Sequence, residues 1–155
     1  MINITIKRAT VDDAFTVGTL VYRLLYELLP EKYSGQNAES LVEVTQQLIG
    51  SESLHVLLVK TKSGTGIGVI TLNACASIYA RGSFGKICEL FVDPACRSDG
   101  VGTKLIDAAR ELSITLGWSH LEVGAPSLPR WQRTVDFYTS YGFSIVGPRL
   151  SIGLP

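Results

Sequence analysis

The stretch from Lys86 to Thr103 constrains the fold more than any other part of the chain. Its first part, Lys86–Val92, is rich in apolar residues and predicts a strand that Asp93 and Pro94 close. A turn with two glycines follows, and a helical spacing of apolar residues begins inside that turn: Val101, Leu105, Ala108, Ala109, Leu112 and Leu116, with Gly117 as the C-terminal cap. A strand that runs through a glycine-containing turn into a helix is a unit of α/β proteins.

Hydrophobic periodicity predicts the other elements. In the N-terminal part we expect a strand over 2–8, a helix from Asp12 to a stop at Pro30, and a second helix ending at Gly50. Two strands follow, 54–60 and 66–75, joined by a turn at 63–66. In the C-terminal part we expect a strand over 120–123, a helix over 131–140, and a last strand pair at 143–146 and 150–154. The order β-αα-βββ-α-β-α-ββ predicts a single α/β domain over 1–155 with a mixed central β-sheet.

Length, charge and cysteine content exclude several classes of protein. The chain has 155 residues, enough for one domain, and its formal net charge is zero, which disfavours nucleic acid as a partner. Its three cysteines show neither a disulfide framework nor a zinc pattern, so we expect no metal. No apolar run approaches the ~18 residues of a membrane span, and the N-terminus does not resemble a signal peptide. We expect a cytoplasmic protein without a membrane partner.

The turn before the predicted helix has the chemistry of a diphosphate site. The first N–H groups of a helix have no intrahelical partner, and Gly100 and Gly102 would let a phosphate approach them. Arg97 lies beside them and could add a charged contact. The spacing matches neither the nucleotide P-loop nor the dinucleotide fingerprint. Two glycines near a helix start are also common in a simple turn, so this pattern alone leaves both interpretations open.

Two motifs taken together resemble the GNAT family, the Gcn5-related N-acetyltransferases. The stretch Glu89–Pro94 followed by Arg97–Gly102 is similar to the family's acetyl-CoA signature, and Phe137–Phe143 is similar to its FYxxxGF segment. The resemblance covers about residues 84–146. It implies a GNAT-like domain whose cosubstrate is acetyl-CoA, and an enzyme that transfers acetyl to a primary amine of a small molecule or peptide by direct attack. The alternative is a non-catalytic domain that binds or senses acyl-CoA.

The resemblance also implies which residues bind the coenzyme. Backbone groups of Phe91 and Val92 would pair with the pantetheine arm as an added strand does. The backbone amides of the following turn and helix start would hold the pyrophosphate: Arg97, Ser98, Asp99, Gly100, Val101, Gly102 and Thr103.

Two residues are candidates for catalysis. Tyr138 matches the family tyrosine that donates to the coenzyme sulfur, and its alternative role is packing on the sheet. Glu89 would deprotonate the amine, or it would only bind substrate or pair with a lysine. Covalent catalysis through Cys88 or Cys96 is a competing mechanism, although both positions suit small packing residues better.

One position departs from the family pattern, and the acceptor stays open. Trp131 stands where the family commonly has an asparagine. With Arg130 and Arg133 it would shape the acceptor pocket or reach the coenzyme phosphates, or the tryptophan would only pack under the last strands. The sequence allows aminoglycosides, polyamines, amino acids, peptide N-termini and lysines as acceptors. The first helices lack a conspicuous acidic cluster, which makes a polycationic acceptor less attractive. A homodimer is possible.

Overall fold

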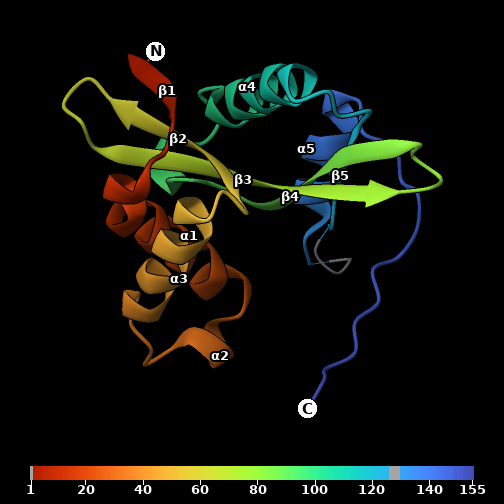
Figure 1. Cartoon of the computed structure of the whole chain (residues 1–155). Helices are drawn as coiled ribbons and strands as arrows, with labels where there is room; N and C mark the ends of the chain where they lie inside the picture. The colour runs from red at the N-terminus through yellow and green to blue at the C-terminus, as the bar shows by residue number, and fades with distance from the viewer. Residues whose placement is uncertain (1, 126–129) are drawn as a thin grey trace. The chain divides into compact units, whose positions relative to one another are not determined.

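A computed structural model of the chain describes residues 2–125 and 130–155 (Figure 1). The described residues divide into two compact units, one that ends at Glu122 and one that begins at Val123.

The first unit is built on a mixed β-sheet. Its strands follow the order β1-β2-β3-β4-β5, with β1 at Ile4–Arg8, β2 at His55–Thr61, β3 at Gly66–Ser77, β4 at Gly82–Val92 and β5 at Leu121–Val123. The first four strands pair antiparallel. Next to β5, Ser119 N–H donates to Ser83 and His120 accepts from Gly85, both at 2.9–3.0 Å. Residue numbers rise together along both strands, which is the parallel pattern.

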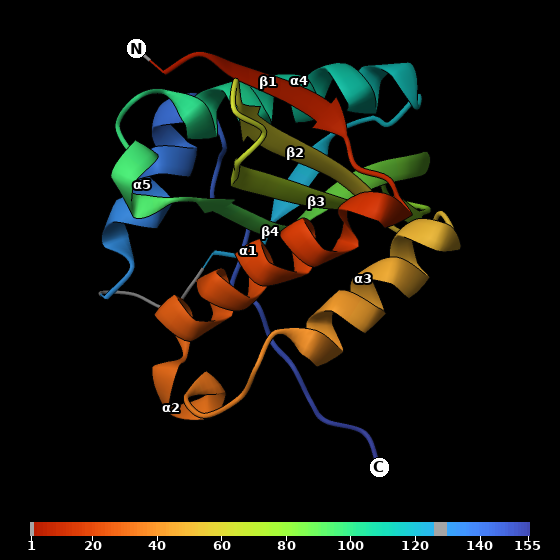
Figure 2. The same cartoon turned by 90° about the vertical axis from the view of Figure 1, so that its left-hand side faces the viewer.

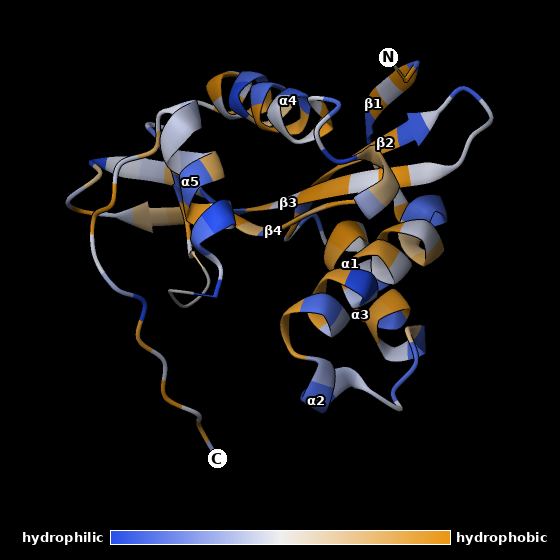
Figure 3. Ribbon diagram, turned by 180° about the vertical axis from the view of Figure 1, so that it is seen from behind, coloured by the Kyte–Doolittle hydropathy of each residue, from blue (hydrophilic) through white to orange (hydrophobic). Residues whose placement is uncertain are grey.

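Helices cover both faces of this sheet. The helices α1 (Ala14–Leu28) and α3 (Glu39–Gly50) lie on one face and α4 (Val101–Thr115) on the other, as Figures 1 and 2 show. A core cluster joins α1 to the sheet through Val17, Leu20, Val56, Leu58, Val69 and Phe91. Figure 3 shows hydrophobic residues concentrated on β3 and α1. Burial of this apolar surface is what holds the layers together.

Two features of the N-terminal half differ in detail from the prediction. The first helix ends at Leu28, before Pro30 as expected, but Pro30 then opens a short helix, α2 (Pro30–Tyr33). Proline suits the first helical position because the N–H it lacks has no partner there. The strands β3 and β4 also extend further toward their connection, where Ser77 pairs with Gly82.

The second unit contains α5 (Gln132–Tyr141), close to the helix expected over 131–140. The expected final strand pair, 143–146 and 150–154, is not formed, and described residues 142–155 carry no regular element. The large aliphatic side chains of residues 145–154 are exposed, from 78% for Ile145 to 89% for Leu150. An alternating pattern becomes a strand only where a neighbouring strand accepts its hydrogen bonds, and none does so here. The α/β class and the mixed sheet are as predicted; one domain over 1–155 stays a prediction.

Candidate functional site

The N-terminus of α4 presents backbone N–H groups in an open turn. Gly100 precedes the helix with a φ of 77°, and the helix has no side-chain cap there. Ser98 is also left-handed, with a φ of 74°. Lys104 is the first residue whose N–H bonds back to Gly100, at 3.0 Å. The N–H groups of the first turn therefore lack intrahelical partners and carry the positive end of the helix dipole.

The space in front of this turn suits a bulky anion. A Cβ added at Gly100 would meet nothing within 4 Å, and Ser98, Asp99 and Gly100 are all exposed. Left-handed residues in a turn aim successive N–H groups into one concavity that binds anions. The residues present therefore fit a phosphate-containing group.

Arg97 lies differently from the prediction that it contacts a phosphate. Its Nη1 and Nη2 donate to Glu27 Oε1 and Oε2 at 2.9 and 2.7 Å, and its Nε donates to the Val92 carbonyl at 2.9 Å. The guanidinium thus joins α1 to the end of β4. Contact with a phosphate would require it to leave Glu27.

The end of β4 extends beyond its parallel neighbour. The hydrogen bonds with β5 begin near Gly85 and His120, and β5 ends at Val123. If the two strands advance one residue at a time from that pair, Val123 lies opposite about residue 88 of β4. The backbone of Phe91 and Val92 therefore lies past the end of β5 on that side. A strand edge of this kind accepts an extended ligand as an additional strand.

Glu89 faces the α1 and α3 side of the sheet. Its carboxylate accepts a hydrogen bond from the buried Thr71 hydroxyl, and its own N–H donates back to that hydroxyl at 3.0 Å. The register of β3 and β4 shifts beside this pair, where Cys88 is the extra residue. A small cavity of about 80 Å³ adjoins the carboxylate and is otherwise lined by apolar side chains and threonines: Val17, Val21, Leu41, Val44, Thr45, Leu48, Leu54 and Thr71.

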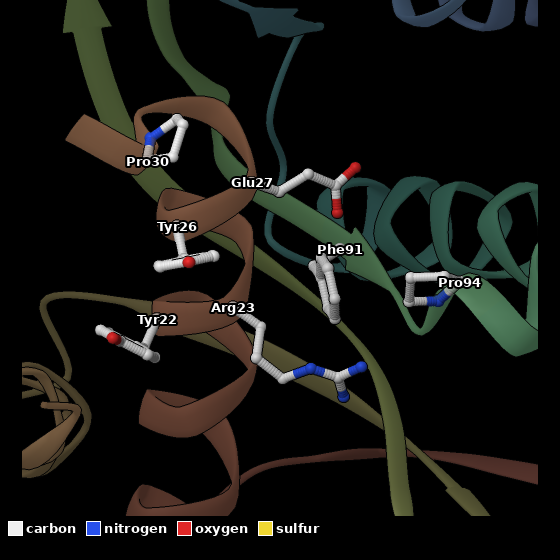
Figure 4. A pocket seen from close by; sticks show the side chains of 7 residues that line it. All are labelled: Tyr22, Arg23, Tyr26, Glu27, Pro30, Phe91 and Pro94. Carbon is white, nitrogen blue, oxygen red and sulfur yellow. The ribbon is translucent and has the colours of Figure 1, made fainter. Parts of the chain in front are cut away.

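A larger pocket of about 620 Å³ opens between α1 and the end of β4 (Figure 4). Its lining combines aromatic, proline and charged residues: Tyr22, Arg23, Tyr26, Glu27, Pro30, Phe91 and Pro94. Only Phe91 belongs to the predicted site. Tyr22 and Tyr26, and likewise Arg23 and Glu27, stand four positions apart, a spacing that puts each pair on one face of a helix. That spacing places the side chains on shared faces of the helix but does not by itself predict a pocket.

Tyr138 lies in the second unit and is buried, with 7% of its surface exposed. Its ring makes edge contacts with Phe137 and Phe143, with centroids 5.4 and 5.3 Å away. Burial raises the pKa of the Tyr138 phenol well above its ordinary value. The phenol therefore stays protonated at neutral pH, and the same burial makes it a weaker acid than a free tyrosine.

Trp131 caps the start of α5, and its carbonyl accepts from Thr134 N–H at 3.0 Å. The Arg130 guanidinium lies over the Trp131 ring at 5.1 Å from its centroid. The indole thus stacks with an arginine where an asparagine would offer hydrogen bonds.

In the part of the chain that the structure describes, no three His, Cys, Asp or Glu side chains gather as metal ligands. Likewise, none of the helices described is long and apolar enough to cross a bilayer. The three cysteines do not pair with one another: Cys88 is exposed, and Cys75 and Cys96 are half-buried.

Comparison with known proteins gives a family and a fold. Residues 52–145 match the model of the acetyltransferase (GNAT) domain. No curated protein matches the chain. An aminoglycoside acetyltransferase from an uncultured soil metagenomic sample, solved with sisomicin, is similar in structure, with a TM-score of 0.76 at 21% identity over 98% of this chain and 95% of that one. The ribosomal-protein-alanine N-acetyltransferase of Brucella melitensis biovar Abortus 2308 has a TM-score of 0.75 at 16% identity over 98% and 99% of the two chains.

A third similar structure, of AAC(6′)-Iy, was solved with a bisubstrate analogue of coenzyme A and acetylneamine. It has a TM-score of 0.76 at 15% identity, and the match covers 99% of both chains. At these identities the three structures establish the fold alone.

Proposed function

Because this chain belongs to the GNAT family of acetyltransferases, we propose that it transfers the acetyl group of acetyl-CoA to a primary amine by direct attack. The observation that supports this most is the uncapped start of α4, where Gly100 leaves open space before the first-turn N–H groups. Bound there, acetyl-CoA supplies an activated thioester. In the reaction a C–N bond forms, the C–S bond breaks, the amine loses one proton and the departing thiolate gains one.

The proposed binding residues act through the backbone. The N–H groups of the turn and first helical residues hold the pyrophosphate: Arg97, Ser98, Asp99, Gly100, Val101, Gly102 and Thr103. Phe91 and Val92 pair with the amides of the pantetheine arm, since their edge of β4 extends past β5. The Arg97 side chain supports this edge through its bond to the Val92 carbonyl.

Two side chains are proposed to move protons. The attacking nitrogen must be neutral, and the Glu89 carboxylate accepts its proton, directly or through a water. The Tyr138 Oη donates a proton to the departing sulfur, and its raised pKa keeps that proton on the phenol at neutral pH until the thiolate forms. Neither step needs an enzyme nucleophile, so Cys88 and Cys96 have no part in it.

The first experiment compares the unfolding temperature of the protein with and without acetyl-CoA. Ligand at about 100 times its dissociation constant stabilises by about 2.7 kcal/mol, which raises the midpoint by several degrees. Release of free thiol on adding amines then separates the acetyltransferase from an acyl-CoA-binding domain without activity. No stabilisation at millimolar ligand would contradict the proposal.

A further inference from the structure

The pocket between α1 and the end of β4 has the size and walls of a small-molecule site. Its volume of about 620 Å³ lies within the range of about 300–1,000 Å³ that is usual for such sites. The rings of Tyr22, Tyr26 and Phe91 and two prolines form most of its walls (Figure 4). Walls of this kind favour an apolar or aromatic ligand body, which gains from burial and ring contacts.

The charges around this pocket are already paired. Arg23 Nη2 lies 2.9 Å from Asp93 Oδ2, and both oxygens of Glu27 accept N–H groups of Arg97. The net charge of these two guanidiniums and two carboxylates is therefore zero. Both guanidiniums also lie over the Phe91 ring, at 5.1 and 5.5 Å from its centroid. An additional ammonium group that entered here would lose its hydration, and no carboxylate of this pocket would be free to pair with it.

The reacting end of a ligand in this pocket would point along β4. Phe91 lines the pocket, and Glu89, two positions earlier, lies on the same face of the strand. The Glu89 carboxylate adjoins the smaller cavity between α1 and α3 and takes no part in the paired charges of this pocket.

We infer that the acceptor is a monoamine carried on an apolar, preferably aromatic, body, and that polycationic amines are poor acceptors. This inference rests on the proposed function. It assigns the pocket on α1 to the acceptor and separates this chain from its structural neighbours that are aminoglycoside acetyltransferases, because an aminoglycoside carries several ammonium groups.

The test measures acetyl transfer from acetyl-CoA to phenethylamine, kanamycin and spermidine at one pH and ionic strength. We expect kcat/KM for phenethylamine to exceed that for either polycation by about tenfold or more, since tenfold corresponds to only 1.4 kcal/mol. The same amines are titrated calorimetrically into the protein saturated with coenzyme A, so that selectivity is measured even if no acetyl group moves.

Two variants test whether the selectivity between amines arises in this pocket. Tyr26 is 48% exposed, so Tyr26→Ala removes an aromatic wall with little risk to the fold. We expect it to raise KM for phenethylamine about tenfold while leaving coenzyme affinity unchanged. Tyr79→Ala is the control, because Tyr79 is 69% exposed on the connection between β3 and β4.

The outcomes separate the two proposals. Turnover that favours a polycation, or indifference of phenethylamine to Tyr26→Ala, would overturn the inference while acetyl transfer stands. Selective phenethylamine binding without turnover of any amine would support the acceptor pocket and overturn the proposed function. If none of the three amines binds or reacts, the inference about the acceptor fails, and the thermal shift with acetyl-CoA decides the proposed function separately.

Discussion

The guanidinium of Arg97 donates to both carboxylate oxygens of Glu27, a residue 70 positions earlier in the chain, at 2.9 and 2.7 Å. The same side chain donates through Nε to the Val92 carbonyl. A second pair, Arg23 with Asp93, joins the same two parts of the molecule. Helix α1 is therefore tied at two points to the segment that leads from β4 into α4.

Glu27→Gln should weaken coenzyme A binding several-fold, because Arg97 loses its bidentate partner and holds the end of β4 less firmly. The fold should lose at most about 1 kcal/mol, since the pair is partly exposed to solvent. Calorimetric titration with coenzyme A at low and high salt measures the effect. Glu43→Gln, on the exposed side of α3, is the matched control. Tighter binding in Glu27→Gln would mean instead that Arg97 contacts the phosphates when it is released.

Gly102→Val should abolish coenzyme binding and leave the fold intact. Gly102 lies in the first turn of α4, where a branched side chain obstructs an anion approaching the N–H groups. The thermal shift with acetyl-CoA should disappear while the circular dichroism spectrum stays the same. Glu111→Val places the same side chain on an exposed position of α4 and should keep the full shift. Unchanged affinity in Gly102→Val would rule out this turn as the pyrophosphate site.

Tyr138→Phe should lower kcat on the order of a hundredfold and change coenzyme affinity much less, because only the proton donor is lost. Burial raises the pKa of the Tyr138 phenol, so its protonated form persists to high pH and Tyr138 causes no loss of activity below about pH 10. A pH–rate profile of both proteins measures this. Tyr141→Phe on the same helix is the control. A Tyr138→Phe variant with normal kcat would remove Tyr138 from the role of acid.

Glu89→Gln should reduce turnover on the order of a hundredfold, because an amide cannot accept the proton. The amide oxygen can still accept from the Thr71 hydroxyl, so stability should change little. Thr71→Val supplies the comparison, since it removes the hydrogen bond and keeps the carboxylate. Should Thr71→Val lose activity while Glu89→Gln retains it, Glu89 serves the structure of the sheet and not the chemistry.

Asp13→Asn should lower the free energy of unfolding at pH 7 by about 2 kcal/mol. Burial by itself would raise the pKa of Asp13, but the Thr10 N–H and the ammonium groups of Lys7 and Lys60 outweigh it and lower the pKa from 3.8 to about 2. Because the folded pKa is the lower one, this stability is complete above about pH 4 and is lost as pH falls toward 2. Urea unfolding of both proteins at several pH values should show the difference shrinking over that interval. A difference independent of pH would show that the charge of Asp13 is not its source.

Local chemistry made the centre of the fold predictable. Gly100 and the apolar spacing of α4 indicated a strand–turn–helix unit, and the structure contains it with Gly100 left-handed at the helix start. The turn chemistry at 63–66 likewise indicated the hairpin of β2 and β3. These features depend on residues close in sequence, where backbone preferences act directly.

Contacts between distant residues were not predictable in the same way. Arg97 carries a charge beside a phosphate-binding turn, and nothing local reveals that Glu27 neutralises it. The pocket on α1 needs the packing of that helix against β4, which periodicity predicts only as burial of one face. The apolar alternation near Leu150 gave a strand prediction that failed, because pairing depends on a partner strand and not on the pattern alone.

The double tie between α1 and the segment before α4 also bears on how such a protein can evolve. Both ties are made by residues that line the pocket, Arg23 and Glu27. A substitution that reshapes the pocket at either position also releases a residue near the start of α4, so the two effects arise together. Mutational libraries should therefore show modest epistasis between positions 23 and 93 and between 27 and 97, and paired exchanges there should be tolerated better than single ones.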